Sequence, residues 1–255
     1  MVDNVFEIWK ASKRQPFHKI GKDGKYEAKP AMSGPAAQLV FVNLDRDADI
    51  VGVFVGSPID KAVFNLLPRL KCIVTMSTGF DHIDIAEAKR RGLPVLNVPA
   101  YGEHTVAEHT LALILALSRK IYPSVKRVKE GNYDWHGLTG TDLCGKTLGV
   151  VGTGRIGANV ITMAKGFQMN ILAYDPFRKP EFENLYTTLP KLIKQSDIIT
   201  LHVPLTKKTH HLLNKTNLGT AHRGVMIVNT ARGGLIDPEA LLAGLDSGLI
   251  SGAGL

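Results

Sequence analysis

The sequence predicts an α/β protein with two doubly wound parallel-sheet domains, and three observations carry this prediction. Short β-branched runs alternate with helical apolar stripes from residue 49 to about residue 101. The same alternation resumes at residue 146 and continues to residue 255. This second series opens with glycines at G-x-G-x-x-G spacing, set between an apolar run and a helical stripe. Strands and helices that alternate in this way form parallel sheets covered by helices.

Before residue 102, the clearest elements lie between residues 50 and 98. We expect strands over residues 50–55, 70–76 and 95–98, and helices over residues 60–67 and 83–91. The preceding segment carries a weaker pattern. Val5, Phe6 and Ile8 fit an edge strand, and residues 38–43 fit either a helix or a strand. We assign the first domain to residues 1–101 and the second to residues 102–255.

The second domain begins with a helix over residues 105–120 that is apolar on nearly every face. A helix without a polar face is buried, either inside its domain or against a partner. A glycine-rich loop over residues 131–145 follows. Beyond the loop we expect strands over residues 147–151, 171–174, 197–202, 225–229 and 250–255, and helices that begin inside the glycine run and over residues 189–195, 215–218 and 238–247.

The glycine run has the residues that a dinucleotide-binding turn needs. Gly152 permits a tight turn, Gly154 leaves the backbone open to a pyrophosphate, and Gly157 lets the helix pack closely on the strand. The N–H groups at the start of that helix attract phosphates. Asp175 ends the next strand and can accept hydrogen bonds from a ribose diol, which favours NAD over NADP. Arg178 is close in sequence and would oppose this preference.

The composition favours a cytoplasmic protein that binds small molecules. The net charge of +8 is spread along the chain, so we expect a solvated basic surface and no nucleic-acid partner. The longest apolar run is too short to span a bilayer, and we expect no membrane association. Cys72 and Cys144 lie far apart and indicate no disulfide framework. No spacing of His, Cys, Asp and Glu suggests a metal site.

Six longer stretches occur in order between about residue 48 and residue 255. They read STGFDHID from residue 77, NVPAYGEHTVAEH from 97, GKTLGVVGTGRIG from 145, AYDP from 173, DIITLHVPLT from 197 and VNTARGGLID from 228. Together they resemble the D-2-hydroxyacid dehydrogenase family, and most closely its D-lactate dehydrogenase branch. The resemblance implies a flavodoxin-like substrate domain and an NAD-binding Rossmann domain. The second domain is expected to be incomplete, as in a member truncated at its C-terminus.

The resemblance also implies a role for individual residues. Arg232 matches the family's catalytic arginine, whose planar fork suits a carboxylate and whose charge polarises a ketone. The residues implied to contact the substrate are Ser77, Thr78, Gly79 and Tyr101. The residues implied to contact NAD are Gly152, Gly154, Arg155, Ile156, Gly157, Asp175, Val203, Pro204, Thr209, Thr230, Ala231 and Arg232.

The implied reaction is the NAD-dependent interconversion of D-lactate and pyruvate, by a homodimer that pairs through the helix over residues 105–120. The family's catalytic glutamate and histidine correspond to positions beyond Leu255, and His104 replaces an expected asparagine. We therefore expect this chain to bind NAD(H) weakly and to reduce pyruvate slowly, since acid–base groups contribute about 10²–10⁴-fold in rate. Two alternatives stay open. One is reduction of glyoxylate or another 2-oxo acid, and the other is an NAD-binding regulatory or scaffold protein of the corepressor type.

Overall fold

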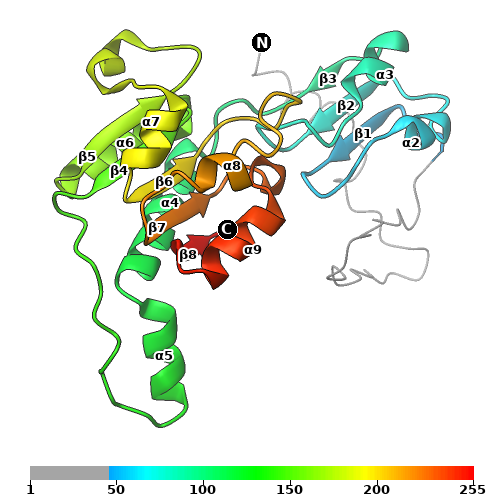
Figure 1. Cartoon of the computed structure of the whole chain (residues 1–255). Coiled ribbons are helices and arrows are strands. Elements are labelled where there is room, and N and C mark those ends of the chain that lie inside the picture. Colours follow the sequence, from blue (N-terminus) through cyan, green and yellow to red (C-terminus); the bar gives the residue numbers. More distant parts are fainter. Residues whose placement is uncertain (1–45) are drawn as a thin grey trace. The chain divides into compact units, whose positions relative to one another are not determined.

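The computed structural model describes residues 46–255, and the chain divides into two compact units, Met1–Tyr101 and Gly102–Leu255 (Figure 1). Both units are built on parallel sheets, so the predicted fold class is confirmed. The expected edge strand near Phe6 and the element expected over residues 38–43 lie outside the described residues. No helix in the described part of the chain is long and apolar enough to cross a membrane.

The first unit carries a three-stranded parallel sheet with the order β1-β2-β3. Its described elements are β1 (Ile50–Val53), α2 (Lys61–Asn65), β2 (Cys72–Thr75), α3 (Ile85–Arg90) and β3 (Val95–Leu96). Both helices begin at an aspartate, because Asp60 accepts a hydrogen bond from the backbone N–H of Val63 and Asp84 accepts one from Glu87.

The two helices of this unit pack into one hydrophobic cluster. Phe64 of α2 and Ala88 of α3 are buried together with Val53 and Ile73 of the strands. The strand order advances in one direction, and right-handed crossovers then bring consecutive helices to the same face of the sheet. Within α3, Glu87 accepts from Arg90 and from the capping residue Arg91, and these contacts lower the pKa of Glu87 to about 2. Arg91 also joins the two helices, because its guanidinium donates to the carbonyl oxygen of Phe64 in α2 at 2.8 Å.

The second unit carries a five-stranded parallel sheet with the order β5-β4-β6-β7-β8. Its helices are α4 (Glu103–Ser118), α5 (Ile121–Lys129), α6 (Arg155–Gly166), α7 (Leu189–Gln195), α8 (Lys215–Leu218) and α9 (Pro238–Asp246). Its strands are β4 (Thr147–Val151), β5 (Asn170–Tyr174), β6 (Ile198–Leu201), β7 (Val225–Asn229) and β8 (Ile250–Gly254). The chain passes from β4 outward to β5 and then crosses back to β6, which pairs with the other edge of β4, so the strand order reverses at β4.

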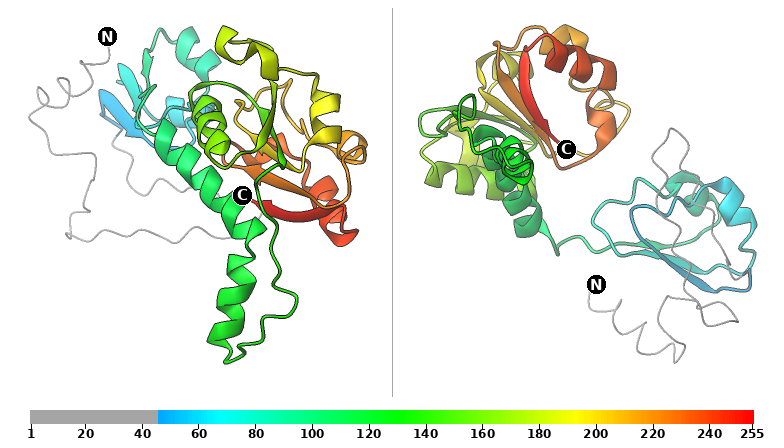
Figure 2. Two further views of the ribbon diagram at one scale, coloured as in Figure 1. Left: turned by 90° about the vertical axis from the view of Figure 1, so that its left-hand side faces the viewer. Right: turned by 90° about the horizontal axis from the view of Figure 1, so that it is seen from below.

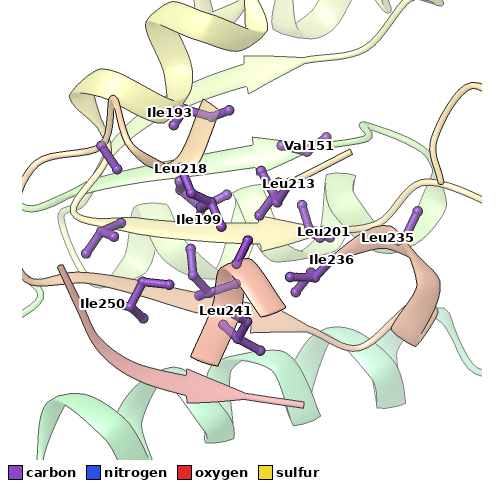
Figure 3. Packing of buried hydrophobic residues seen from close by; sticks show 14 of the residues in the cluster. Val151, Ile193, Ile199, Leu201, Leu213, Leu218, Leu235, Ile236, Leu241 and Ile250 are labelled. Atoms are coloured by element: carbon purple, nitrogen blue, oxygen red, sulfur yellow. The ribbon is translucent and has the colours of Figure 1, made fainter. Parts of the chain in front are cut away.

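Helices cover both faces of the second sheet, because its central strands are apolar at consecutive positions. Val151 and Ile199 belong to a cluster with residues of α7, α8 and α9, part of which is seen in Figure 3. Their chain neighbours Val150 and Ile198 belong to a second cluster with residues of α4 and α6. Successive side chains of a strand point to opposite faces, so a continuous apolar run is the pattern of a strand buried on both sides.

Helix α5 and two 3-10 helices were absent from the sequence-based expectations. The 3-10 helices are η1 (Pro180–Leu185) and η2 (Gly233–Leu235). Helix α5 has Ile121, Val125 and Val128 on one face, but none of its residues is buried. It extends beyond the body of the second unit (Figure 2). The sequence predicted no helix here, because the basic residues of this segment concealed the helical spacing of its apolar ones.

Candidate functional site

The residues predicted to bind the cofactor follow four strand ends that lie side by side. Tyr174, Val151, Leu201 and Asn229 pair in that order across the sheet, and they are the last residues of β5, β4, β6 and β7. Because the strands are parallel, the segments that follow all leave the same edge of the sheet. In open α/β sheets ligands bind at this edge, where the strand order reverses.

The three glycines of the turn after β4 meet different physical demands. Gly152 has φ +97°, and a Cβ there would lie 2.7 Å from the carbonyl oxygen of His202. A Cβ on Gly157 would collide with the carbonyl oxygen of Gly152. Gly154 has an ordinary φ of −56°, and apart from its own neighbours in the chain no protein atom lies within 4 Å of the position of its Cβ. Neither strain nor internal packing requires glycine at 154, so the open backbone there fits the close approach of a pyrophosphate.

Helix α6 begins at the turn and presents its N-terminus to the same edge of the sheet. No side chain caps the helix at Gly154. Such a terminus, with its positive end of the helix dipole, attracts anions. Arg155 is exposed and forms an ion pair of 3.5 Å with Glu103, the first residue of α4, whereas Ile156 is half-buried against the cluster of α4 and α6.

Asp175 is held toward the turn by its own hydrogen bonds. One carboxylate oxygen accepts from the backbone N–H of Thr153 at 2.7 Å and from its hydroxyl at 3.2 Å. The other accepts from the backbone N–H of Phe177 at 2.8 Å. These bonds orient the carboxylate at the end of β5, and an ionised carboxylate has further acceptor capacity for a ribose hydroxyl.

The loop after β6 is fixed by a reciprocal pair of threonines. The hydroxyl of Thr209 donates to the carbonyl oxygen of Pro204 at 2.6 Å and accepts from the backbone N–H of Thr206 at 2.7 Å. Thr209 therefore shapes the segment that contains Val203 and Pro204. At the start of this loop, burial lowers the pKa of His202 to about 4. Its ring lies 3.0 Å from the hydroxyl of Thr200 and is neutral at physiological pH.

The loop after β7 holds Thr230, Ala231 and Arg232, and Asn229 shapes it from both sides. The Asn229 side chain accepts from the backbone N–H of Ala231 at 3.0 Å and donates to the carbonyl oxygen of Arg232 at 2.8 Å. The hydroxyl of Thr230 lies 2.9 Å from that of Thr110, a buried residue of α4. The Arg232 guanidinium donates to the carbonyl oxygen of Ala231 at 2.9 Å.

The residues predicted to bind the substrate's carboxylate, Ser77, Thr78 and Gly79, belong to the first unit and follow the end of β2. The buried hydroxyl of Ser77 donates to the carbonyl oxygen of Gly79 at 2.7 Å. Thr78 is tied to the segment after β3, because its hydroxyl donates to the carbonyl oxygen of Val98 at 3.0 Å. Tyr101, at the end of the unit, is 60% exposed.

The sequence did not mark several residues that organise these loops. Thr153 and Asn229 lie inside the motifs given above, but only their neighbours were predicted to bind the cofactor. Thr110 lies 120 positions from its partner Thr230, so no local pattern could reveal the contact. Among residues 46–255, no three His, Cys, Asp or Glu side chains are placed to hold a metal ion.

His202 should make the stability of the second unit depend on pH. Its folded-state pKa of about 4 lies below the usual 6.5, so the unfolded chain takes up the proton first as the pH falls. Stability should decline from about pH 6.5 toward pH 4, by on the order of 3 kcal/mol for this group. Denaturant unfolding of the unmodified protein and of His202→Gln checks this. The variant should lose that part of the decline, whereas the exposed-residue control His222→Gln should keep it.

Comparison with known proteins identifies the family. The description "D-isomer specific 2-hydroxyacid dehydrogenase, NAD binding domain" belongs to the family model that matches residues 111–255. A glyoxylate reductase of Korarchaeum cryptofilum is 39% identical over 87% of this chain and 69% of its own length. A D-lactate dehydrogenase of Escherichia coli is 39% identical over 81% of this chain and 64% of its own length. The chain thus spans about two thirds of the length of these relatives.

A solved structure agrees with the sequence matches. The D-lactate dehydrogenase of Aquifex aeolicus, complexed with NAD and lactic acid, superposes with a TM-score of 0.77 at 40% identity. The superposition covers 82% of this chain and 64% of that one. The glycine turn, Asp175 and Arg232 all lie inside the segment that the family model matches. The chain therefore belongs to the D-isomer specific 2-hydroxyacid dehydrogenase family, and residues 111–255 form its NAD-binding domain.

Proposed function

We propose that this protein is an NAD-dependent dehydrogenase that interconverts D-lactate and pyruvate. The observation that carries the proposal is the row of strand ends in the second unit. The glycine turn follows β4, Asp175 follows β5 and Arg232 lies in the loop after β7, so the residues proposed to bind the dinucleotide and the cation proposed to bind the carboxylate share one sheet edge. Two relatives support the substrate, since they are named D-lactate dehydrogenases.

The roles we propose follow from the chemistry of each group. NAD, when bound, supplies the hydride acceptor. The N-terminus of α6 and the open backbone at Gly154 hold its pyrophosphate, and Asp175 accepts from its ribose. The Arg232 guanidinium binds the carboxylate of the 2-oxo acid and draws electron density from its ketone oxygen. In the first unit, the proposed role of the loop at Ser77, Thr78 and Gly79 is to offer backbone N–H groups to a substrate carboxylate.

Glyoxylate is the second candidate substrate, because one relative is named a glyoxylate reductase. Both compounds are 2-oxo acids and would use the same cation. The reacting carbonyl carbon carries a methyl group in pyruvate and a hydrogen in glyoxylate. The preference between the two substrates therefore depends on whether the site has space for one methyl group. A regulatory role without turnover is the remaining alternative.

Oxidation of NADH with pyruvate and with glyoxylate tests the function. We expect slow turnover with both acids and a higher kcat/KM for pyruvate. Arg232→Gln should lower kcat/KM by roughly 10²–10³-fold, since it removes a charge from the reacting group. Arg232→Lys should retain more activity than the glutamine variant because it keeps the charge but loses the fork.

The matched control for these variants is Arg223→Gln. Arg223 is an exposed arginine near the opposite end of β7, where it donates to the carbonyl oxygen of Ser247. The control should keep its kcat/KM within about twofold, as expected of a surface change. A protein that binds NADH but oxidises it with neither acid would contradict the dehydrogenase and favour the regulatory alternative.

Gly154 offers a direct test of the cofactor site. At both Gly154 and Gly166, the last residue of α6, a Cβ would meet no atom within 4 Å other than those of its neighbours in the chain. Gly154→Ala should weaken NADH binding about tenfold or more, because its methyl would occupy the space of the pyrophosphate. Gly166→Ala should bind NADH as the unmodified protein does. Fluorescence titration and unfolding temperatures check both variants, and equal affinities in the two would refute the proposed role of Gly154.

We also propose a homodimer, and the support comes from exposed apolar residues in the segment that follows α4. The buried side of α4, which includes Ala107, Leu111 and Ile114, is already covered within the second unit. Exposed large apolar residues continue on α5 and the loop after it, and they are Ile121, Tyr122, Val125, Val128, Tyr133 and Trp135. Clustered apolar surface of this kind marks an interaction site, and a two-fold contact would cover it in both copies.

Light scattering at micromolar concentration tests the dimer. Val125→Asp introduces a charge on the apolar face of α5 and should shift the protein toward the monomer. Lys126→Asp changes a neighbouring residue outside that face and should leave the dimer in place. A monomeric unmodified protein would contradict the proposal.

A further inference from the structure

The segment after Asp175 folds back on the end of β5. After η1, residue Tyr186 forms an isolated parallel bridge with Ala173, and the backbone N–H of Thr187 donates to the carbonyl oxygen of Ala173 at 2.9 Å. The chain between Asp175 and Tyr186 is thereby closed into a short loop beside the cofactor edge of the sheet.

Tyr186 joins that loop to the glycine turn. Its hydroxyl lies 2.7 Å from the hydroxyl of Thr153 and accepts from the backbone N–H of Lys179 at 2.9 Å. Thr153 is the same residue that donates two hydrogen bonds to Asp175. The ring of Tyr186 also lies 5.4 Å from the guanidinium carbon of Arg178, in a cation–π contact.

The side chain of Tyr186 therefore links Arg178 to Thr153, which donates to Asp175. The Arg178 guanidinium pairs with Glu183 of η1 at 3.1 Å. The neighbouring Lys179 pairs with Glu181 of the same 3-10 helix at 3.9 Å. Both cations that follow Asp175 thus have an acidic partner supplied by η1. A cation at this place is the group that accommodates the 2′-phosphate of NADP.

We infer that Glu183 is a cofactor-specificity residue, which keeps Arg178 paired and so withholds it from a 2′-phosphate. The inference rests on the proposed use of NAD(H) by this site. Asp175 repels a 2′-phosphate, and Arg178 would attract one if it were released. The Glu183 carboxylate removes that attraction, so the two acids act in the same direction. Glu183 acts through Arg178 and needs no contact with the cofactor.

The expected effect is modest because the pair is exposed. The side chains of Arg178 and Glu183 are 53% and 62% exposed, and exposed ion pairs are weak and screened by salt. Removing the Glu183 charge should raise the affinity for NADPH relative to NADH by about two- to fivefold. The gain should shrink in about 0.5 M salt.

Titration of NADH and NADPH into the unmodified protein, Glu183→Gln and Glu181→Gln tests the inference. Glu181 is the matched control, since its side chain is 61% exposed and lies on the same 3-10 helix. Each variant removes one negative charge, but only Glu183→Gln releases Arg178. We expect the affinity ratio to move toward NADPH in Glu183→Gln more than in Glu181→Gln. The double variant Arg178→Gln/Glu183→Gln should lose that gain.

The outcomes separate this inference from the proposed function. An unchanged ratio in Glu183→Gln, with normal NADH binding, overturns the inference alone. Equal shifts in Glu181→Gln and Glu183→Gln also overturn it, because a general charge effect would then account for both. If the relative gain in NADPH affinity persists in the double variant, the role of Arg178 in the inference is overturned. An unmodified protein that binds neither dinucleotide overturns the proposed cofactor site together with the inference.

Discussion

The close approach of α6 to the turn after β4 is the constraint on which the second unit depends. The first turn of the helix packs so near the carbonyl oxygen of Gly152 that only glycine fits at residue 157. The turn also lies against the residues that follow β6, so only glycine fits at residue 152. Larger residues at either position would push the helix away from the sheet. The N-terminus of α6 would then no longer lie at the strand ends, and the apolar contacts between α6 and α4 would loosen.

The same approach brings polar groups together at the cofactor edge. Because the turn is tight, the backbone N–H of Thr153 points at the carboxylate of Asp175 from the neighbouring strand. Asp175 therefore accepts hydrogen bonds from the protein itself, and these bonds set the orientation of its carboxylate. An acceptor that is already oriented loses little conformational entropy on binding, which is the advantage of a preorganised site. The Asn229 side chain gives the loop after β7 the same kind of internal support.

The fold of the second unit was largely predictable because its central strands are buried on both faces. Such strands carry largely apolar runs rather than an alternating pattern, and the bounds of β4 and β7 agree with the expected ones. Helix α7 also agrees, since Thr188 caps it and Pro190 lies in its first turn. Helix α5 escaped prediction because basic residues lie among its apolar ones, and none of its residues is buried. The 3-10 helix η1 is short and follows no apolar period.

The sequence by itself determined the glycine turn, the position of Asp175 after the next strand and the family to which the chain belongs, because these depend on residue types at short, regular spacings. Only the tertiary structure decided which side chains hold these residues in place. The contact of Thr110 with Thr230 joins residues 120 positions apart, and the contact of Thr153 with Tyr186 joins residues 33 apart. The pairing of Arg178 with Glu183 spans only five positions, but it depends on the turn of η1 and the ring of Tyr186. Such contacts arise from the path of the folded chain, which local spacing does not encode.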